Sequence, residues 1–218
     1  DNIEGEWDGS ASAPWVSLWE IRRYDIQRIR RSVSTSLDYR LGDASTLTYR
    51  GMYNHRDDFE NRYRLRYIMG EPDASGVQST EIRRQVKMGT SDIKNARRED
   101  QRTQSHSLSG EHLFGSAELE WGLQYARASE ERPNERYLQF RNRRQQARTD
   151  VSDPETPFVT LHGASADLPA SMSFHELTEQ YQWTKDQDVN ARVDLRFPLA
   201  GGRSELQVGA RYRDKTKL

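Results

Sequence analysis

The stretch SVSTSLDYRLGDASTLTYRGMYN, residues 32–54, decides the fold class of this chain. Its first half alternates apolar and polar residues, and residues 42–45 (Gly-Asp-Ala-Ser) then form a turn cluster before the alternation resumes. Successive side chains of a β-strand point to opposite faces, so a period of two predicts strands rather than helices. We therefore predict a β-hairpin whose apolar side chains continue along one face.

The same alternation recurs along most of the chain and predicts an all-β, antiparallel up-and-down meander of about nine or ten strands. Charged runs at residues 56–59, 97–102 and 129–134 are predicted to be loop tips. Residues 151–172 contain three prolines and are predicted to form a long loop. The first 24 residues show no sustained period. Further strands are expected at residues 62–69, 81–94, 108–114, 117–125, 135–145, 177–183, 189–197 and 206–212.

Composition excludes several classes of protein. Only 33% of the 218 residues are apolar and 31% are charged, against roughly 45–50% and 25% in ordinary soluble domains, so one large core is not expected. The net charge of −1 gives no basic field for nucleic acid. Cysteine is absent, which excludes disulfides and thiolate sites. No apolar run is long enough for a transmembrane helix, whereas a membrane-spanning strand needs only about 9–11 residues.

Two architectures fit the alternation. In a soluble β-sandwich the outer faces of both sheets meet water. In a transmembrane β-barrel the apolar face meets lipid, aromatic residues lie at both membrane interfaces and the polar face lines a wet lumen. Tyrosines near the ends of the predicted strands are placed as interface residues would be, and the periodicity alone leaves both architectures open. These tyrosines are Tyr39, Tyr53, Tyr67 and Tyr125.

Six short segments follow one another along the chain: SLDYRL (36–41), LTYRGMYN (47–54), RYRLRY (62–67), LSGEHLFG (108–115), WGLQYARA (121–128) and ERPNE (131–135). In this order they resemble the barrel strands of TonB-dependent outer-membrane receptors. The resemblance extends from about Arg22 to Lys217, and it lies in the order of the segments rather than in any one of them.

This resemblance implies a 22-stranded barrel in the bacterial outer membrane, closed by an N-terminal plug and driven by the TonB complex. Such a receptor imports a nutrient, for example an iron chelate, cobalamin or an oligosaccharide. The chain begins at Asp1 without methionine, contains no TonB box or plug sequence, and ends in Lys215-Thr216-Lys217-Leu218 rather than in an aromatic residue. We therefore expect residues 1–218 to be an internal barrel segment that contacts outer-membrane lipid, with the TonB contacts made elsewhere. The alternative is a soluble β-sandwich or jelly-roll module that binds carbohydrate or protein.

The candidate ligand-binding residues lie on the polar faces of predicted strands. Arg62, Arg64 and Arg66 alternate with apolar residues and would project together into a lumen, where they would attract an anionic solute. Glu118 and Glu120 share a second polar face and are also lumen candidates. The alternative for all five is a solvated face on which each charge pairs with a neighbouring strand.

No catalytic, metal or cofactor site is predicted, and we do not expect an enzyme. His106 and His112 share a strand face but are six residues apart, too far for one metal ion. Residues 91–94 match Ser-x-x-Lys, yet the companion motifs of that hydrolase class are missing. Arginines at residues 136–148 interleave with aromatic residues as on an RNA-binding surface, but no binding motif accompanies them, so no nucleic-acid partner is expected.

Overall fold

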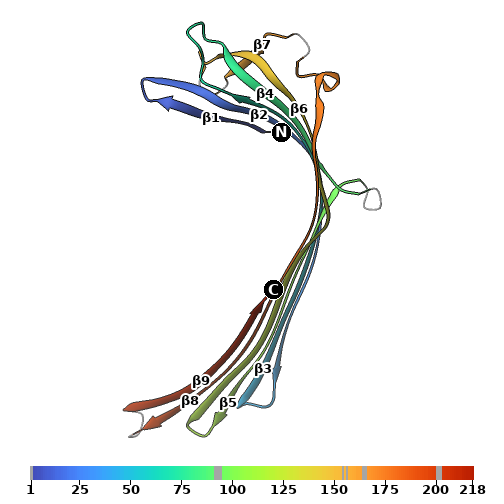
Figure 1. Ribbon diagram of the computed structural model, residues 1–218. Helices are drawn as coiled ribbons and strands as arrows, with labels where there is room; N and C mark the ends of the chain where they lie inside the picture. The colour runs from blue at the N-terminus through green and yellow to red at the C-terminus, as the bar shows by residue number, and fades with distance from the viewer. Residues whose placement is uncertain (1, 91–94, 154, 156, 164–165, 200–202) are drawn as a thin grey trace. The chain divides into compact units, whose positions relative to one another are not determined.

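The computed structural model describes residues 2–90, 95–153, 155, 157–163, 166–199 and 203–218, and these residues form one antiparallel sheet of nine strands (Figure 1). The prediction of an all-β, antiparallel meander is confirmed. In the described part, the helical element given by the structure is a short 3-10 turn, Pro169–Ser171, and no helix there has the length and apolar character to cross a membrane. The strands are β1 (Asn2–Ser10), β2 (Ala13–Arg40), β3 (Ser45–Met69), β4 (Gln78–Met88), β5 (Arg97–Phe114), β6 (Ala117–Asp150), β7 (Phe158–Leu161), β8 (Ser173–Leu199) and β9 (Ser204–Lys217).

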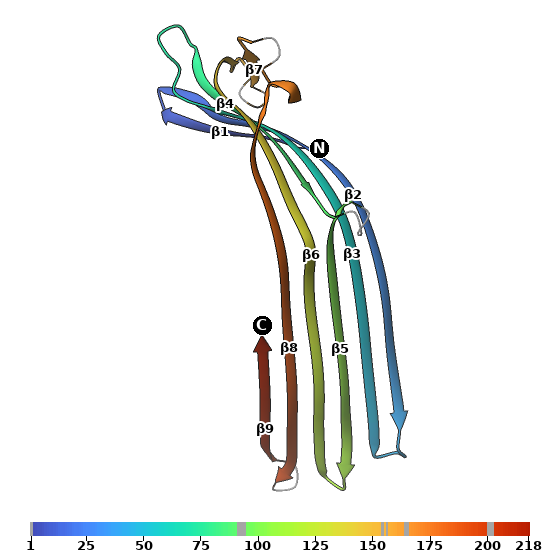
Figure 2. The ribbon, with the colours of Figure 1, turned by 45° about the vertical axis from the view of Figure 1, so that its right-hand side comes forward.

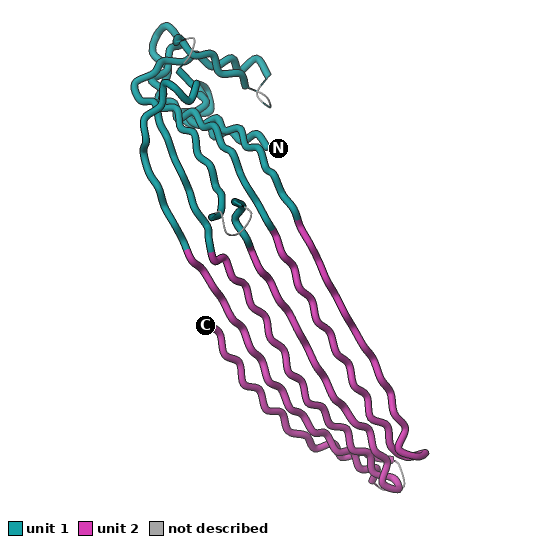
Figure 3. Tube along the Cα trace, turned by 90° about the vertical axis from the view of Figure 1, so that its right-hand side faces the viewer, with its two compact units in different colours: residues 1–27, 59–98, 134–180 teal, residues 28–58, 99–133, 181–218 magenta. Residues whose placement is uncertain are grey.

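The chain divides into two compact units (Figure 3). Unit 1 comprises residues 1–27, 59–98 and 134–180, and unit 2 comprises residues 28–58, 99–133 and 181–218. Strands β2, β3, β5, β6 and β8 contribute residues to both units, although only Arg97 and Arg98 of β5 belong to unit 1. Both β4 and β5 pair with β3 and β6, so β4 and β5 take the same place in the strand order. In unit 2 the long strands lie side by side in the order β2-β3-β5-β6-β8-β9 (Figure 2).

The predicted hairpins of unit 2 are present. Between β2 and β3 the amide of Leu41 donates to the carbonyl of Ser45 over 2.8 Å, and Gly42 has a φ of 90°. Between β5 and β6 the ladder closes at the pair Phe114 and Ala117, with Gly115 at a φ of 64°. The strands predicted at residues 189–197 and 206–212 lie in β8 and β9, which pair antiparallel, and residues 200–202 between them lie outside the described residues.

The three charged runs predicted as loop tips are instead parts of strands, and that prediction is wrong. Residues 56–59 lie in β3, 97–102 in β5 and 129–134 in β6. The strands continue because charges pair with charges on the neighbouring strands. Arg56 on β3 bonds to Glu99 on β5 over 2.8 Å, and Arg132 on β6 lies 3.2 Å from the same carboxylate. With charges on both faces, these stretches lack the alternation by which strands are recognised.

The ends of the predicted pattern also differ from expectation. The first 24 residues, which show no period, form β1 and the first part of β2, paired from Asn2 with Arg22 to Ser10 with Ala13. The described residues between 151 and 172 include loop, as predicted, but also β7 and the 3-10 turn. Val159, Leu161 and Met172 of this segment pack against the hydrophobic core of unit 1, and Ala166 belongs to that core although it lies outside the β-strands. The buried core residues are Val16, Trp19, Tyr67, Met69, Ile82 and Ala166.

Two details of unit 1 follow from this packing. Tyr67, expected among the interface tyrosines, is only 7% exposed and belongs to the core. Buried Gln78 holds the core edge together, because its amide donates to the carbonyls of Val16 and Gly70 over 3.0 Å each and its oxygen accepts from the hydroxyl of Thr149 over 2.7 Å. A buried amide with these partners loses little free energy on leaving water.

A β-bulge interrupts the pairing of β4 with β6. The register shifts between Thr80 and Ile82, which face Gln145 and Asn142, so β6 has one residue more than β4 at this point. Arg144 lies within the extra stretch and has a φ of 60°, a left-handed conformation that occurs in one class of β-bulge. The side chains of β6 therefore exchange faces across the bulge.

The Gly115 turn gives a direct test of the β5–β6 hairpin. We expect Gly115→Ala to lower the free energy of unfolding by about 1 kcal/mol, because an alanine side chain disfavours a positive φ. The added Cβ meets no atom within 4 Å, so a steric clash does not contribute. Denaturant unfolding of the full-length protein measures the change, with Ser116→Ala as the control. Equal midpoints for the two variants would contradict the left-handed turn.

Candidate functional site

Two of the three predicted arginines surround a single buried carboxylate in unit 1. The side chain of Glu20 on β2 is 0% exposed. Arg66 on β3 donates to it, and the guanidinium of Arg64 lies 3.7 Å from the same carboxylate oxygen. Arg22 on β2 binds the second oxygen. These arginines share a face, as predicted, and are engaged in an ion cluster within the sheet.

The third predicted arginine has a different partner. The guanidinium of Arg62 donates to the side-chain oxygen of Gln85 on β4 over 3.1 Å. Arg62 and Arg66 flank Arg64, and this crowding has an electrostatic effect. Burial first, and then the positive charge of Arg66, lower the pKa of Arg64 to about 10. Arg64 thus remains protonated at neutral pH.

The same cluster sets the ionisation of Glu20. Burial by itself raises the pKa of this carboxyl group, but hydrogen bonds from Arg66 and Arg22 and the charge of Arg64 outweigh it, and the pKa lies below its ordinary value of 4.5. A carboxyl group whose pKa is lower in the folded than in the unfolded state stabilises the fold above its unfolded pKa. That stabilisation disappears as the pH falls through the folded pKa.

We therefore expect unit 1 to lose stability below about pH 4.5. Glu20→Gln should remove the part of this pH dependence that Glu20 contributes, while Glu81 and Glu135, whose pKa values are also lowered, retain theirs. At pH 7 the same variant should be less stable by about 2–3 kcal/mol, because three arginines lose their shared carboxylate. Amide hydrogen exchange in residues 13–27 and 59–69, measured from pH 7 to pH 3, reports both effects. Glu6→Gln, at an exposed position, is the control. An unchanged pH profile in Glu20→Gln would count against the cluster.

The two predicted glutamates lie in unit 2 and share one partner. The guanidinium of Arg196 on β8 lies 3.1 Å from the Glu118 carboxylate and 3.0 Å from the Glu120 carboxylate on β6. The predicted arginines belong to unit 1 and these glutamates to unit 2. The structure therefore places Arg64 and Arg66 in one ion cluster and Glu118 and Glu120 in another, while Arg62 bonds to Gln85.

The sheet of unit 2 has one strongly apolar face. Residues directly opposite each other on paired strands share a face, and the register pairs Leu108 with Leu123 and Leu195 with Val208. The same kind of row extends from Val33 on β2 to Leu41, the residue after the end of β2, a length of roughly 26 Å at roughly 3.3 Å per residue. The exposed members of this apolar row are Val33, Leu37, Tyr39, Leu41, Tyr53, Leu108, Phe114, Leu123, Val189, Val193, Phe197, Leu206, Val208 and Tyr212.

The polar side of unit 2 carries an arginine cluster that the sequence analysis missed. A hollow of about 620 Å³ is lined by Arg50 on β3, Arg192 on β8 and Arg211 on β9, among other residues. Arg192 and Arg211 are direct partners in the β8–β9 ladder. None of the three forms an ion pair with a carboxylate among the described residues, whereas neighbouring Arg213 bonds to Asp188 over 3.0 Å.

Like charges directly opposite each other destabilise a sheet, so this arginine cluster favours the binding of an anion. The pairing of Arg192 with Arg211 can be predicted from the sequence. When the predicted strands 189–197 and 206–212 are joined as a hairpin with residues 197 and 206 opposite each other, residue 192 pairs with residue 211. The sequence analysis considered arginines only along single strands, and it did not combine strands across a turn.

A second group of side chains in unit 2 has the composition of a cation site. His55 Nε2 lies 3.1 Å from an Asp100 carboxylate oxygen and 3.4 Å from one of Asp57. Both carboxylates already bind guanidinium groups, since Arg102 donates to both oxygens of Asp100 over 2.9 and 2.8 Å and Arg31 reaches Asp57 over 3.4 Å. A divalent cation would have to displace these arginines. Because residues 56–59 and 97–102 were predicted to be loop tips, the sequence analysis did not place Asp57 and Asp100 near each other.

The other residues considered for metal, nucleic-acid or catalytic sites bond to neighbouring side chains or lie outside the described residues. His106 Nδ1 is 2.8 Å from the Tyr49 hydroxyl, and His112 Nε2 accepts from the indole of Trp121 over 3.0 Å. Arg136 bonds to Glu179 on β8. The Ser-x-x-Lys match at residues 91–94 lies outside the described residues. Comparison of the chain with protein-family models and with curated proteins found no match.

Proposed function

We propose that this chain is part of a β-barrel receptor of the bacterial outer membrane that binds a nutrient outside the cell and passes it through the barrel. The observation that carries the proposal is the division of unit 2 into an exposed apolar face and an arginine-rich polar side. In a membrane barrel these become the lipid face and the lumen face. The resemblance of the sequence to TonB-dependent receptors supports the further step that the TonB complex drives import.

The high exposure of the apolar face supports contact with lipid rather than with water. Leu37 is 62% exposed, Tyr39 65% and Tyr212 62%, and a continuous apolar surface of this kind marks a membrane or protein interface. In the alternative β-sandwich, a second sheet would cover such a face. All nine strands of the described residues belong to one sheet, so the described part of the chain provides no such cover. The length of the row, roughly 26 Å, equals the apolar band of outer-membrane barrels, about 25 Å.

The arginine cluster of unit 2 narrows the class of nutrient. Arg50, Arg192 and Arg211 form no ion pair with a carboxylate in the described part of the chain, and together they offer charge-assisted hydrogen bonds to an anion. Among the nutrients considered, they favour an anionic solute such as a carboxylate-bearing iron chelate over a neutral oligosaccharide. In this proposal the outer membrane is the location of the protein, and neither a catalytic residue nor a resident cofactor takes part.

Cell fractionation tests the membrane assignment. We expect the full-length protein in the outer-membrane fraction, with electrophoretic migration that changes on heating, as folded membrane barrels show. Val208→Lys should reduce the folded fraction, because a lysine on the lipid face costs about 2–4 kcal/mol near the bilayer centre. Gln207→Glu, one position away on the opposite face and directly opposite Arg196, is the control for a charge on the polar side and should fold normally. Recovery of the unmodified protein in the soluble fraction would overturn the proposal.

Ligand binding tests the nutrient class separately. We expect the purified full-length protein to bind the anionic chelate ferric citrate, and Arg192→Ala combined with Arg211→Ala to weaken binding about tenfold or more, since charge-assisted hydrogen bonds contribute about 1.5–3 kcal/mol each. Titration calorimetry at two salt concentrations measures the effect. Lys217→Ala removes one cation near the end of β9 and is the control. Equal affinity in all three proteins would exclude the arginine cluster as the anion site.

A further inference from the structure

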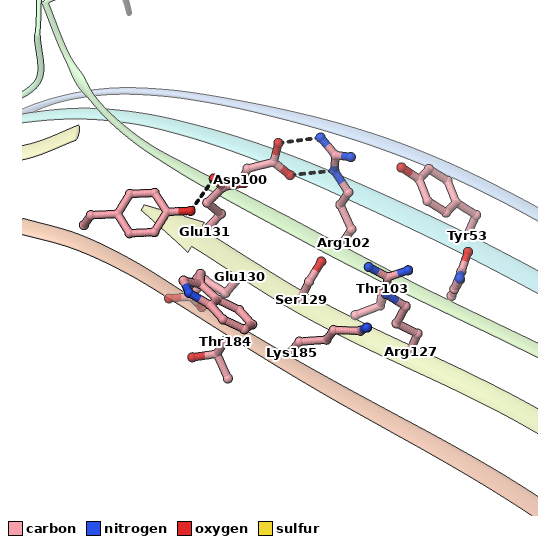
Figure 4. Close-up of a pocket in the computed structure, with 13 residues that line it drawn as sticks. Tyr53, Asp100, Arg102, Thr103, Arg127, Ser129, Glu130, Glu131, Thr184 and Lys185 are labelled. Carbon is pink, nitrogen blue, oxygen red and sulfur yellow. Dashed lines mark hydrogen bonds and ion pairs between the residues drawn. The ribbon is translucent and has the colours of Figure 1, made fainter. Parts of the chain in front are cut away.

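A second hollow of unit 2, of about 450 Å³, opens where the apolar face gives way to charged residues (Figure 4). Three of its lining residues are cations from three neighbouring strands: Arg102 on β5, Arg127 on β6 and Lys185 on β8. Exposed aromatic side chains, Tyr181 and Trp183, line it on β8. The hollow thus combines positive charge with amphipathic aromatic rings.

The charges of this hollow balance in number, because Asp100, Glu130 and Glu131 also line it, but these carboxylates do not engage all of its cations. Arg102 is paired with Asp100, as the dashed lines in Figure 4 show, and the Glu131 carboxylate accepts a hydrogen bond from the Tyr181 hydroxyl over 3.0 Å. Within the described residues, neither Arg127 nor Lys185 forms an ion pair with a carboxylate. Two cations therefore remain available to an external anion.

The hollow continues directly into the apolar row. On β6, Arg127 is followed on the same face by Tyr125 and then by Leu123, and the register places Gln104, His106 and Leu108 of β5 opposite them. On β8 the same progression leads from Lys185 to Val189. All three aliphatic side chains are exposed. A molecule bound here would meet positive charge at one end and an apolar surface about 13 Å further along the strands.

We propose that this hollow binds the phosphate headgroup of a membrane lipid whose acyl chain lies along Leu108, Leu123 and Val189. The inference rests on the proposed outer-membrane location and adds a specific lipid contact to it. Arg127 offers a planar donor pair to a phosphate and Lys185 a compact positive charge. The ring and polar group of Trp183 suit the boundary between lipid and water.

A lipid fits this hollow better than a free anion does. The cation cluster around Arg192 and Arg211 lies on the polar side of the sheet, and the side chains of Val193 and Val208 point to the opposite face. In the hollow around Arg127 and Lys185, charge and exposed leucines adjoin on one face, and only an amphiphile uses both. The acyl chain also covers apolar surface that the sheet itself leaves exposed.

Lipid binding by the full-length protein in detergent micelles tests the inference. The probes are phosphatidylglycerol, zwitterionic phosphatidylcholine and inorganic phosphate, with retained lipid measured by native mass spectrometry. We expect retention of phosphatidylglycerol, and a loss of about tenfold or more in Arg127→Ala combined with Lys185→Ala, as for two lost charge-assisted bonds. Arg192→Ala combined with Arg211→Ala removes two cations from the other side and should retain the lipid fully.

The outcomes separate this inference from the proposed function. Equal phosphatidylglycerol retention by the Arg127/Lys185 variant, equal retention of phosphatidylcholine, or equally tight binding of inorganic phosphate would each overturn the lipid site while leaving the barrel intact. A protein that is soluble without detergent would overturn the outer-membrane location itself. Heat-modifiable migration shows whether the double alanine variant is folded, and Arg127→Lys with Lys185→Arg, which keeps both charges, should restore binding.

Discussion

An extended strand gives each side chain only two directions, and this constraint organises the molecule. In unit 2 one direction collects leucines, valines and aromatic rings, and the other collects arginines and carboxylates. Pairing of neighbouring strands then adds one row to the next, so that the two faces differ across the whole unit. Both proposed ligands follow from this separation, a lipid on the apolar face and an anionic solute on the polar side.

Ion pairs between strands allow the sheet to continue where the apolar pattern ends. The carboxylate of Glu99 serves two arginines, Arg56 and Arg132, from the strands on either side of β5. In unit 1, Glu20 is shared among three arginines in the same way. Buried charges of this kind tolerate little change, because removing one partner leaves the others unpaired in a poorly hydrated place.

The sequence predicts the hairpins well and the charged strands poorly, for one physical reason. At Gly42 and Gly115 a turn residue and an alternating pattern agree, and the structure contains both hairpins. Residues 97–102 are polar on both faces, and only their partners on other strands reveal them as a strand. The candidate sites follow the same rule. The shared face of Arg62, Arg64 and Arg66 is a local property, whereas their engagement with distant Glu20 and Gln85 is set by tertiary pairing.

The bulge at Arg144 restricts how the length of β6 can change. Beyond it, buried Ala147 and the hydroxyl of Thr149, which meets Gln78, lie on their correct sides only because the strand carries one extra residue. Loss or gain of a single residue between Asn142 and Ala147 would turn the rest of the strand over. Sequence drift in this stretch should therefore proceed by substitution or by paired insertions and deletions, with single-residue length changes eliminated.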